Sequence, residues 1–466
     1  MKQHHQIGRL GSSLAVIALL AASCSSGSDT TSSTDDPPAS DAADASAVDS
    51  APAESTSTEP SAETDPPANT PSDTEASETE SSEPPAADAG ADFGSRGPAT
   101  GEPILLGMVN TEGTAGLDFP EMRTDTDLAV IYLNEHGGMG GRPVQIEHCA
   151  AAGSPETSQA CAQELSGKGV ELVMLGLDLF PGYDTFAASG IPVVGALPIL
   201  PPDYSADALF VTGGNATTMA AMVALAVEEF DASTVGIISA DNAGANGSEA
   251  ALIGALEKAG LTYVSIKGGD NETDAGFQGL IREANSDSPD VLVSLYADAG
   301  CIGAMRGRVA LGIDTPMIST AICGSAEVLD VVGDDAIGWN FIAVGAPNDT
   351  TAAREFDDII APVYGEGATG TLGLGALGIT QVMTLARIAN SIADGGGEVT
   401  GQAIYDTLGS TTDLASFPND SKLTCGLSAT YPSVCSFEFP IGRYGADGVI
   451  ETVPGFEGVN VVDYLP

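Results

Sequence analysis

The chain has 466 residues, of which 65 are Asp or Glu and 15 are Lys or Arg, giving a formal net charge of -50. A surface this acidic repels nucleic acid and anionic lipid headgroups, so we expect no nucleic-acid partner and no direct membrane-surface binding. Residues 101–466 are too many for one ordinary hydrophobic core, and we expect them to form two lobes.

The N-terminus has the pattern of a secretory signal. A basic stretch precedes an uncharged, mostly apolar run from Leu10 to Ala22, which is shorter than the roughly 20 residues that cross a bilayer. The small residues before Cys24 resemble the lipobox of bacterial lipoproteins, in which the signal is cleaved before a lipid-bearing cysteine. We therefore expect residues 1–23 to be removed and Cys24 to anchor the protein by lipid to the outer face of the bacterial cell membrane. The alternative is an ordinary cleaved signal with an incidental cysteine.

The composition of residues 24–100 predicts a disordered tether that follows the lipidated cysteine. After Cys24 the segment consists almost entirely of Ser, Thr, Pro, Ala, Asp and Glu, and Arg96 is its basic residue. Such a segment has almost no large apolar side chain whose burial could offset the entropy of ordering.

Cysteine usage favours disulfide bonds. With Cys24 assigned to lipid, an even number of cysteines remains, and in an exported chain an even number favours disulfides. The sequence leaves the connectivity open, and pairing between close neighbours is the hypothesis adopted here: Cys149–Cys161, Cys301–Cys323 and Cys425–Cys435. Metal binding is the weaker alternative, because there is no CxxC pair and the histidines of the folded part are His136 and His148.

From Pro103 onward, apolar strand-like runs alternate with helical patterns. Ser154 before Pro155 is a favourable helix start, since proline at the first helical position gives up no needed hydrogen bond. Buried strands joined by helices predict a parallel sheet with helices on both faces. The first series comprises strands at 103–109, 142–149, 170–176, 191–197 and 208–214, with helices at 121–136 and 155–169.

A second series opens at Asn215 and repeats the alternation. Its helices are expected at 217–230, 248–260 and 276–287, its strands at 234–240, 261–268, 289–296 and 316–323, and 299–313 continues the pattern. After 338–347 the chain is mainly helical through Ala393. The fold class expected is therefore α/β, with two doubly wound parallel-sheet lobes.

The stretch YLNEHGGMGGRPV joins the first predicted helix to the second predicted strand. Its pattern and the strand order resemble the type I periplasmic-binding-protein family, in particular the branched-chain amino acid and amide-binding lipoproteins of ABC importers. Gly137 and Gly138 are expected to end the helix in conformations that glycine adopts at low cost. The residues that carry the match are Asn134, Gly137, Gly138, Gly141, Arg142 and Pro143.

The resemblance covers roughly residues 103–466 and implies a hinge of three crossovers, near Gly213, Gly345 and Pro440. Lobe 1 is then expected to comprise residues 101–213 and 345–440, and lobe 2 residues 214–344 and 441–466. It also implies a monomeric solute-binding protein that captures a small molecule between its lobes and delivers it to ABC-transporter permease subunits. A solute-sensing receptor without transport and a non-binding structural surface protein are the alternatives.

Enzyme motifs are missing from the sequence. There is no GxSxG, no HExxH and no P-loop, and the glycines of GLDLFPG and GALGIT lack the fingerprint that cradles pyrophosphate. We therefore expect no catalysis, no cofactor and no metal.

Ligand sites in open α/β sheets lie beyond the carboxyl ends of the strands. This rule indicates the loops 109–116, 176–183, 196–204, 240–247, 296–301 and 320–325. The ligand-binding candidates within them are Asp178, Phe180, Tyr183, Leu197, Tyr204, Asp241, Tyr296 and Asp298.

The ligand is predicted to be neutral or cationic. In amino-acid-binding relatives the first-lobe loops carry hydroxyls for the ligand carboxylate, whereas GLDLFPG and ALPILPP have few, and Asp178 would repel a carboxylate. Aromatic side chains supply apolar walls with polar tips. We predict an amide-like or aromatic small molecule rather than leucine; a helix cap is the alternative role for Asp178.

Overall fold

The computed structural model describes residues 93–114, 118–297, 299–345, 350–365 and 374–466. The predicted signal, Cys24 and the predicted tether up to residue 92 lie outside the described residues, and so does Asp298. Among the helices of the described ranges, none is long and apolar enough to cross a membrane.

The first sheet has five strands in the order β2-β1-β3-β4-β5, and each neighbouring pair is parallel. Its strands are β1 (Ile104–Thr111), β2 (Val144–Ala151), β3 (Leu172–Leu175), β4 (Val193–Gly195) and β5 (Leu209–Phe210). The helices between them are α1 (Pro120–Glu135), α2 (Pro155–Lys168) and α3 (Tyr183–Ala188). The helix start predicted at Pro155 is confirmed, since the Ser154 side chain accepts a hydrogen bond from Thr157 N.

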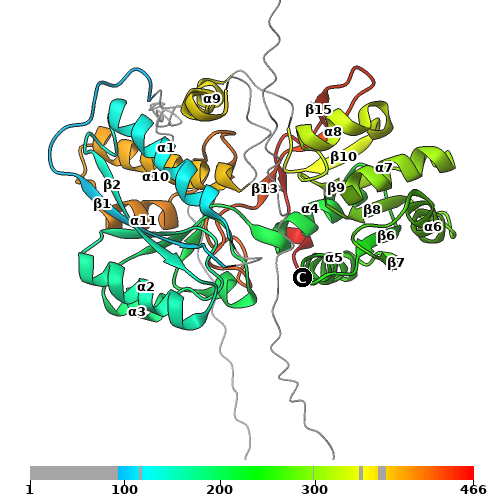
Figure 1. Cartoon of the computed structure of the whole chain (residues 1–466), viewed down its shortest axis with the longest axis horizontal. Helices are drawn as coiled ribbons and strands as arrows, with labels where there is room; N and C mark the ends of the chain where they lie inside the picture. Colours follow the sequence, from blue (N-terminus) through cyan, green and yellow to red (C-terminus); the bar gives the residue numbers. More distant parts are fainter. Residues whose placement is uncertain (1–92, 115–117, 298, 346–349, 366–373) are drawn as a thin grey trace, which may run out of the picture. The chain divides into compact units, whose positions relative to one another are not determined.

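Alternate side chains of a strand point to opposite faces of the sheet, so each buried strand contributes side chains to two hydrophobic cores. On β3, Leu172 and Met174 join the core beneath α1 and α10 (Gly375–Asp394), while Val173 and Leu175 join the core beneath α2 and α3. Figure 1 shows α1 and α10 on one side of this sheet and α2 and α3 on the other. Helices α9 (Thr351–Tyr364) and α11 (Gly401–Ser410) also contribute to the first of these cores.

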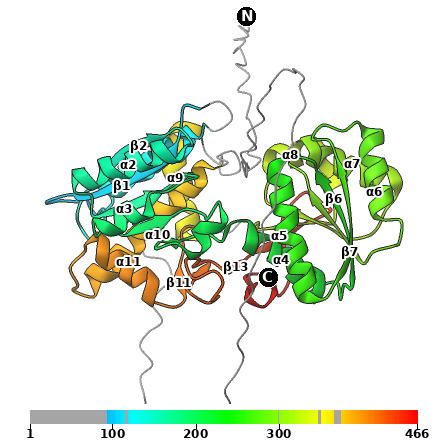
Figure 2. The same cartoon turned by 90° about the horizontal axis from the view of Figure 1, so that it is seen from below.

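The second sheet has seven strands in the order β15-β14-β10-β9-β8-β6-β7. The strands are β6 (Thr234–Ala240), β7 (Thr262–Gly268), β8 (Val291–Leu295), β9 (Met317–Thr320), β10 (Trp339–Ile342), β14 (Ile441–Tyr444) and β15 (Ile450–Thr452). The helices are α4 (Gly214–Glu228), α5 (Ala243–Ala259), α6 (Asp274–Ala284), α7 (Ala299–Leu311) and α8 (Ala326–Val332). Val291 and Val293 of β8 pack with α4 and α5, whereas Leu292 packs with α6 and α7, and Figure 2 shows these helix pairs around the sheet.

The predicted α/β class with parallel-dominated sheets is confirmed, and one edge of the second sheet adds a feature that the sequence did not predict. Strands β14 and β15 pair antiparallel with each other, and β14 pairs antiparallel with β10. The connection between β14 and β15 is short, so these two strands form a hairpin, which a parallel pair could not do without a long crossover.

The chain passes between the two sheets in both directions. After β5 it enters α4 in the second sheet's core, and after β10 it returns to α9 in the first sheet's core. Near its end, Cys435 belongs to the first core and Phe437 to the second. Two short antiparallel ribbons flank this last passage, β11 (Leu414–Ala415) with β12 (Lys422–Leu423), and β13 (Glu438–Phe439) with β16 (Val459–Asn460).

The joint between α1 and β2 depends on glycine, as predicted. Gly137 and Gly138 have φ of 93° and 62°, and a Cβ on Gly138 would lie 2.0 Å from the carbonyl oxygen of Arg142. Asn134 closes the joint, since its Nδ2 donates to Val144 O at 3.0 Å and its Oδ1 accepts from Val144 N at 2.7 Å. These contacts fix where the second strand begins.

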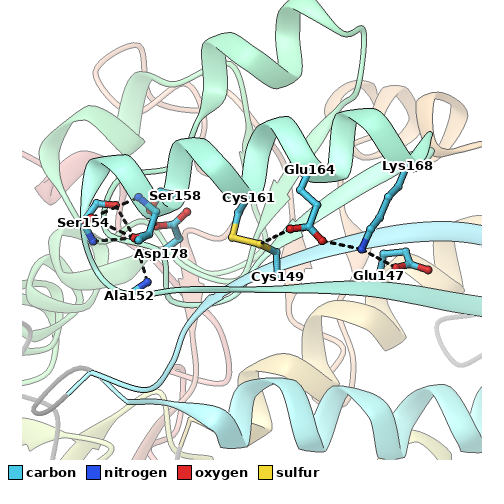
Figure 3. The surroundings of a disulfide bond; sticks show 10 residues. Glu147, Cys149, Ala152, Ser154, Ser158, Cys161, Glu164, Lys168 and Asp178 are labelled. Atoms are coloured by element: carbon cyan, nitrogen blue, oxygen red, sulfur yellow. Dashed lines mark hydrogen bonds and ion pairs between the residues drawn. A yellow bond between two sulfur atoms is a disulfide. The ribbon is translucent and has the colours of Figure 1, made fainter.

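All three sequential cysteine pairs are disulfide bonds in the structure: Cys149–Cys161, Cys301–Cys323 and Cys425–Cys435. The first ties β2 to α2 (Figure 3), and Lys168 on the same helix makes ion pairs with Glu147 and Glu164. Groups of acidic, histidine or cysteine side chains suited to a metal ion are not found among the residues that the structure describes.

Candidate solute-binding site

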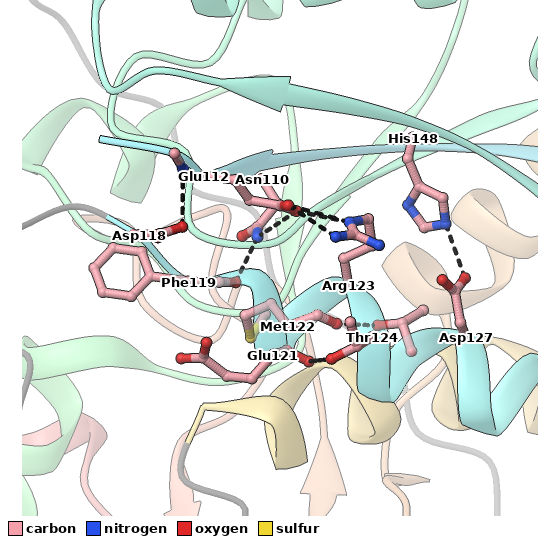
Figure 4. Close-up of polar contacts among 12 residues, drawn as sticks. Asn110, Glu112, Asp118, Phe119, Glu121, Met122, Arg123, Thr124, Asp127 and His148 are labelled. Atoms are coloured by element: carbon pink, nitrogen blue, oxygen red, sulfur yellow. Dashed lines mark hydrogen bonds and ion pairs between the residues drawn. The ribbon is translucent and has the colours of Figure 1, made fainter. Parts of the chain in front are cut away.

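The carboxyl end of β1 is held by a hydrogen-bond network around Asn110, which is buried. Its Nδ2 donates to Phe119 O at 2.7 Å, and its Oδ1 accepts from Leu177 N at 3.0 Å, so it links the loops that follow β1 and β3 (Figure 4). Glu112 pairs with Arg123 through two nitrogens, with Nε–Oε1 at 3.0 Å. These contacts make the edge of the sheet a preorganised platform.

Asp178 lies in the loop after β3 and is only 2% exposed. Its Oδ1 accepts from Ser158 Oγ at 2.5 Å (Figure 3) and from Phe180 N at 3.1 Å. Its other oxygen, Oδ2, has no hydrogen-bond partner within the described ranges. The alternative role as a helix cap is not what the structure shows, because α3 starts at Gly182 without a side-chain cap.

A second carboxylate, Asp203, is placed beside the first by the loop after β4. Its Oδ2 accepts from Ile199 N and Leu200 N, each at 2.8 Å, and its Oδ1 accepts from Tyr183 Oη at 2.8 Å. Tyr183 stands at the start of α3, so its ring connects the loops after β3 and β4. The predicted candidates Asp178 and Tyr183 are thus brought together with Asp203, which the sequence analysis did not single out.

Burial governs the electrostatics of this cluster. Desolvation raises the pKa of the Asp178 carboxyl above its ordinary value, and the nearby Asp203 carboxylate raises it further, against the hydrogen bonds from Ser158 and Phe180. Desolvation also raises the pKa of Asp203, and the pKa of Tyr183 is raised well above that of a free phenol. The site therefore disfavours additional negative charge.

The remaining first-sheet candidates lie around this cluster in different settings. Phe180 is half-buried, and Leu197 is a partly buried side chain that packs against the first sheet's core. Tyr204 faces the second sheet's core, with its ring edge-on to Tyr431 at 5.0 Å and its hydroxyl accepting from Ala216 N at 3.4 Å. Burial raises the pKa of Tyr204 to about 12.

The second-sheet candidates are less uniform. Asp241 follows β6 and is exposed, with Oδ1 accepting from Asn246 Nδ2 at 3.4 Å. Tyr296 follows β8 but is only 2% exposed, since its ring packs edge-on against Phe277 at 5.0 Å within the core. Its hydroxyl has no hydrogen-bond partner in the described part of the chain, and burial raises its pKa to about 12. The roles of Asp241 and Tyr296 as ligand contacts stay predictions.

The loops at this edge of the second sheet are joined covalently. Cys301, in the first turn of α7, bonds to Cys323, in the loop after β9, so the disulfide connects the segments that follow β8 and β9. Both cysteines are buried. Such a cross-link limits the conformations of both loops and holds their backbone in place.

The polar atoms at the first sheet's edge are carboxylate, hydroxyl, amide and backbone groups, which recognise a ligand by hydrogen bonds and charge. The sequence could have indicated Asp203, because it directly follows Pro202 and proline followed by aspartate is a turn signal. The backbone partners of Asn110 could not be read from the local sequence, since they lie 9 and 67 residues away.

Two parallel-dominated sheets with helices on both faces, and a polar cluster at the carboxyl ends of strands, define the class of two-lobed solute-binding proteins. A family model for periplasmic binding proteins matches residues 103–426. The chain belongs to the periplasmic binding protein family, which confirms the resemblance predicted from the sequence. No curated protein matches the sequence at a significant level.

Solved structures with the same fold cover most of the chain. An ABC transporter substrate-binding protein from Sphaerobacter thermophilus is 20% identical, covers 78% of this chain and 100% of its own, and has a TM-score of 0.61. An extracellular ligand-binding receptor from Verminephrobacter eiseniae is 15% identical, with coverages of 75% and 99% and a TM-score of 0.55. A solute binding protein of an ABC transporter from Rhodopseudomonas palustris, in complex with 3,4-dihydroxybenzoic acid, is 14% identical, with coverages of 77% and 98% and a TM-score of 0.55. At these identities the similarity shows the fold.

Proposed function

We propose that the protein is an extracytoplasmic solute-binding lipoprotein that captures a small molecule between two lobes and delivers it to an ABC importer. The observation that carries the proposal is the match of the periplasmic binding protein family to residues 103–426. The similar structure from Sphaerobacter thermophilus, described as an ABC transporter substrate-binding protein, supports the link to an importer.

The lobes are proposed to comprise residues 101–213 with 345–440, and residues 214–344 with 441–466. Support comes from the packing, because α9, α10 and α11 share a core with the first sheet, and β14 extends the second. A solute held between lobes would contact the strand ends of both sheets, so candidates from each side contribute to one site.

The solute is proposed to be neutral or cationic, with amide-like or aromatic character. The buried Asp178 with its unpaired oxygen supports this charge preference, because a ligand carboxylate next to it would add an uncompensated buried charge. The Rhodopseudomonas palustris protein binds an aromatic ligand, which supports the aromatic character, but that ligand is a benzoic acid and therefore does not support the charge preference.

Isothermal titration calorimetry of the mature chain tests this proposal after a thermal-shift screen of amides, aromatic amines and branched-chain amino acids. We expect at least one amide or amine to bind, and Asp178→Asn to weaken a cationic ligand by about tenfold, the effect of losing one charge-assisted hydrogen bond. Asp184→Asn is the matched control, since Asp184 is exposed in the first turn of α3. Micromolar binding of leucine, isoleucine or valine would show the charge assignment to be wrong.

Anchoring is tested separately. Cys24→Ala should move the protein from the membrane fraction to the soluble fraction, because two or more acyl chains at about 0.8 kcal/mol per buried CH2 account for stable attachment. A variant that stays quantitatively with membranes contradicts the lipid anchor but leaves solute binding untouched.

A solute-sensing receptor is the second candidate, and the similarity to the extracellular ligand-binding receptor from Verminephrobacter eiseniae is the observation that favours it. Uptake of the labelled solute by cells with and without the gene separates the two functions. Loss of uptake on deletion supports delivery to an importer, whereas unchanged uptake with a lost transcriptional response supports the receptor.

A further inference from the structure

A cavity of about 380 Å³ lies between the β11–β12 ribbon and the β13–β16 ribbon. It is remote in sequence from every loop discussed above for solute binding. Its wall includes Asp413, Lys422 and Thr424 from the first ribbon and its flanks, and Glu438 and Asn460 from the second. A volume of this size falls within the usual range for small-molecule sites, about 300–1,000 Å³.

Three charged side chains face this cavity without pairing with one another. Within the described ranges, the side chains of Asp413, Lys422 and Glu438 make no ion pair and no hydrogen bond. Other cations of the fold, such as Arg123 and Arg443, do make ion pairs. The polar atoms of these three side chains are therefore available to a ligand.

The three charges are nevertheless close enough to influence one another. Burial raises the pKa of the Glu438 carboxyl, the positive charge of Lys422 lowers it, and the negative charge of Asp413 raises it. Thr424 holds the Asp413 backbone, since its Oγ1 accepts from Asp413 N at 2.9 Å. The carboxylates and the ammonium therefore share one space with room between them.

The charge pattern selects among ligands. A simple anion meets two carboxylates, and a simple cation meets the ammonium of Lys422, so either one leaves a like-charge contact. A molecule that carries both charges offers each of the three side chains a partner of opposite charge.

We propose that this cavity is a second binding site, distinct from the strand-end site, for a small zwitterion. The ligand's ammonium pairs with Glu438 and Asp413, and its acidic group pairs with Lys422. Charge-assisted hydrogen bonds of this kind are shorter and stronger than neutral ones. The amide of Asn460 and the hydroxyl of Thr424 add neutral hydrogen-bonding groups to the same wall.

The experiment scans charge spacing with ω-amino acids. The mature chain is titrated calorimetrically with β-alanine, γ-aminobutyrate, 5-aminovalerate and 6-aminohexanoate, and with butylamine and butyrate as single-charge probes. We expect one spacing to bind best at a single site, and both single-charge probes to bind at least tenfold more weakly, since each loses one charge-assisted pair.

Two substitutions assign that binding to the cavity. Lys422→Gln and Glu438→Gln should each weaken the best ω-amino acid by about tenfold, while Lys422→Arg, which keeps the charge, should retain it. Lys258→Gln is the matched control, because Lys258 is an exposed lysine at the end of α5 that forms no ion pair with any described residue. Circular dichroism and thermal unfolding check that each variant is folded, and Asp413→Asn replaces any variant that is not.

The proposal is overturned by either of two results. One is that no ω-amino acid binds at 10 mM or below, a limit of about 3 kcal/mol in binding free energy. The other is binding that persists unchanged in Lys422→Gln and Glu438→Gln, which places the zwitterion at another site. Neither result bears on the solute of the strand-end site, whose variants at Asp178 are separate.

Discussion

The strand ends of the two sheets are stabilised by different chemistry. At the first sheet, buried carboxylates collect hydrogen bonds from backbone amides and hydroxyls, with Asp203 alone accepting three. At the second sheet, a disulfide between Cys301 and Cys323 joins the loops, Tyr296 is packed in the core, and Asp241 is exposed.

This difference has consequences for what can disturb each edge. A network of buried carboxylates responds to pH, because protonation changes which groups donate and which accept. A covalent cross-link responds to reduction and is indifferent to modest changes of pH. The strand-end loops of the two sheets are therefore expected to lose their structure under different conditions.

Removing the disulfide at the second sheet should have the largest effect. Cys301→Ala combined with Cys323→Ala is expected to lower the free energy of unfolding by about 3 kcal/mol, because the unfolded chain regains the freedom of the loop between them. Guanidinium unfolding measures the change. The matched control removes Cys149–Cys161, whose separation of 12 residues against 22 predicts a loss smaller by roughly half a kcal/mol. If the wild type and the Cys301/Cys323 double variant were equally stable, the disulfide would not stabilise the second sheet.

Removing the hub of the first-sheet network should come next. Asp203→Ala leaves Ile199 N, Leu200 N and Tyr183 Oη without their acceptor, and we expect a loss of about 2–3 kcal/mol in unfolding free energy. Tyr183→Phe removes a single donor and should cost about 1 kcal/mol. Urea unfolding measures the stability loss of both variants. A larger loss for Tyr183→Phe would show that Asp203 is not the central acceptor of this hydrogen-bond network.

The pH response sharpens the contrast further. Burial raises the pKa of Asp178 in the folded state, so its contribution to stability is complete below the ordinary pKa of about 3.9 and is lost as pH rises through the raised value. Asp178→Asn removes this loss, so the variant should gain stability relative to the wild type as the pH rises from about 4 through the raised pKa. Thermal unfolding across that range measures the gain. A difference that stays constant with pH would be evidence against a raised pKa.

The smallest effect is expected at Tyr296. Tyr296→Phe keeps the ring packed against Phe277 and removes a buried hydroxyl that has no partner among the described residues. The free energy of unfolding should therefore fall by less than about 1 kcal/mol, or it should rise. Differential scanning calorimetry detects the shift, and a loss well above that size would mean that the hydroxyl has a bonding role.

Much of the fold could be predicted from the sequence because the signals are local. Buried strands such as VLVSL and the glycine pair at 137–138 require particular environments whatever surrounds them. The strands of the last passage could not be predicted in the same way. Strands β13 and β16 have two residues each and are defined by pairing across the chain rather than by any periodicity.

The sequence indicated some of the residues that meet in the first-sheet cluster but not all of them. The strand-end rule led to Asp178 and Tyr183, whereas their partner Asp203 depends on how two loops fold against each other. Tyr296 was predicted to line the site because it lies at a strand end, but tertiary packing buries its side chain. The solvent exposure of a side chain depends on the residues that pack around it, so it cannot be predicted from the sequence of one loop.

The passage of the chain back and forth between the sheets also constrains the order of folding. The core beneath α1 and α10 includes residues from Phe93 to Cys435, and the core beneath α4 and α5 includes residues from Ala216 to Leu465. A chain that emerges with its N-terminus first can form the strands of the first sheet early, yet it cannot complete either core until nearly all of its length is available. Contacts of such long sequence separation slow folding, which favours a chain that stays unfolded while it is threaded across a membrane.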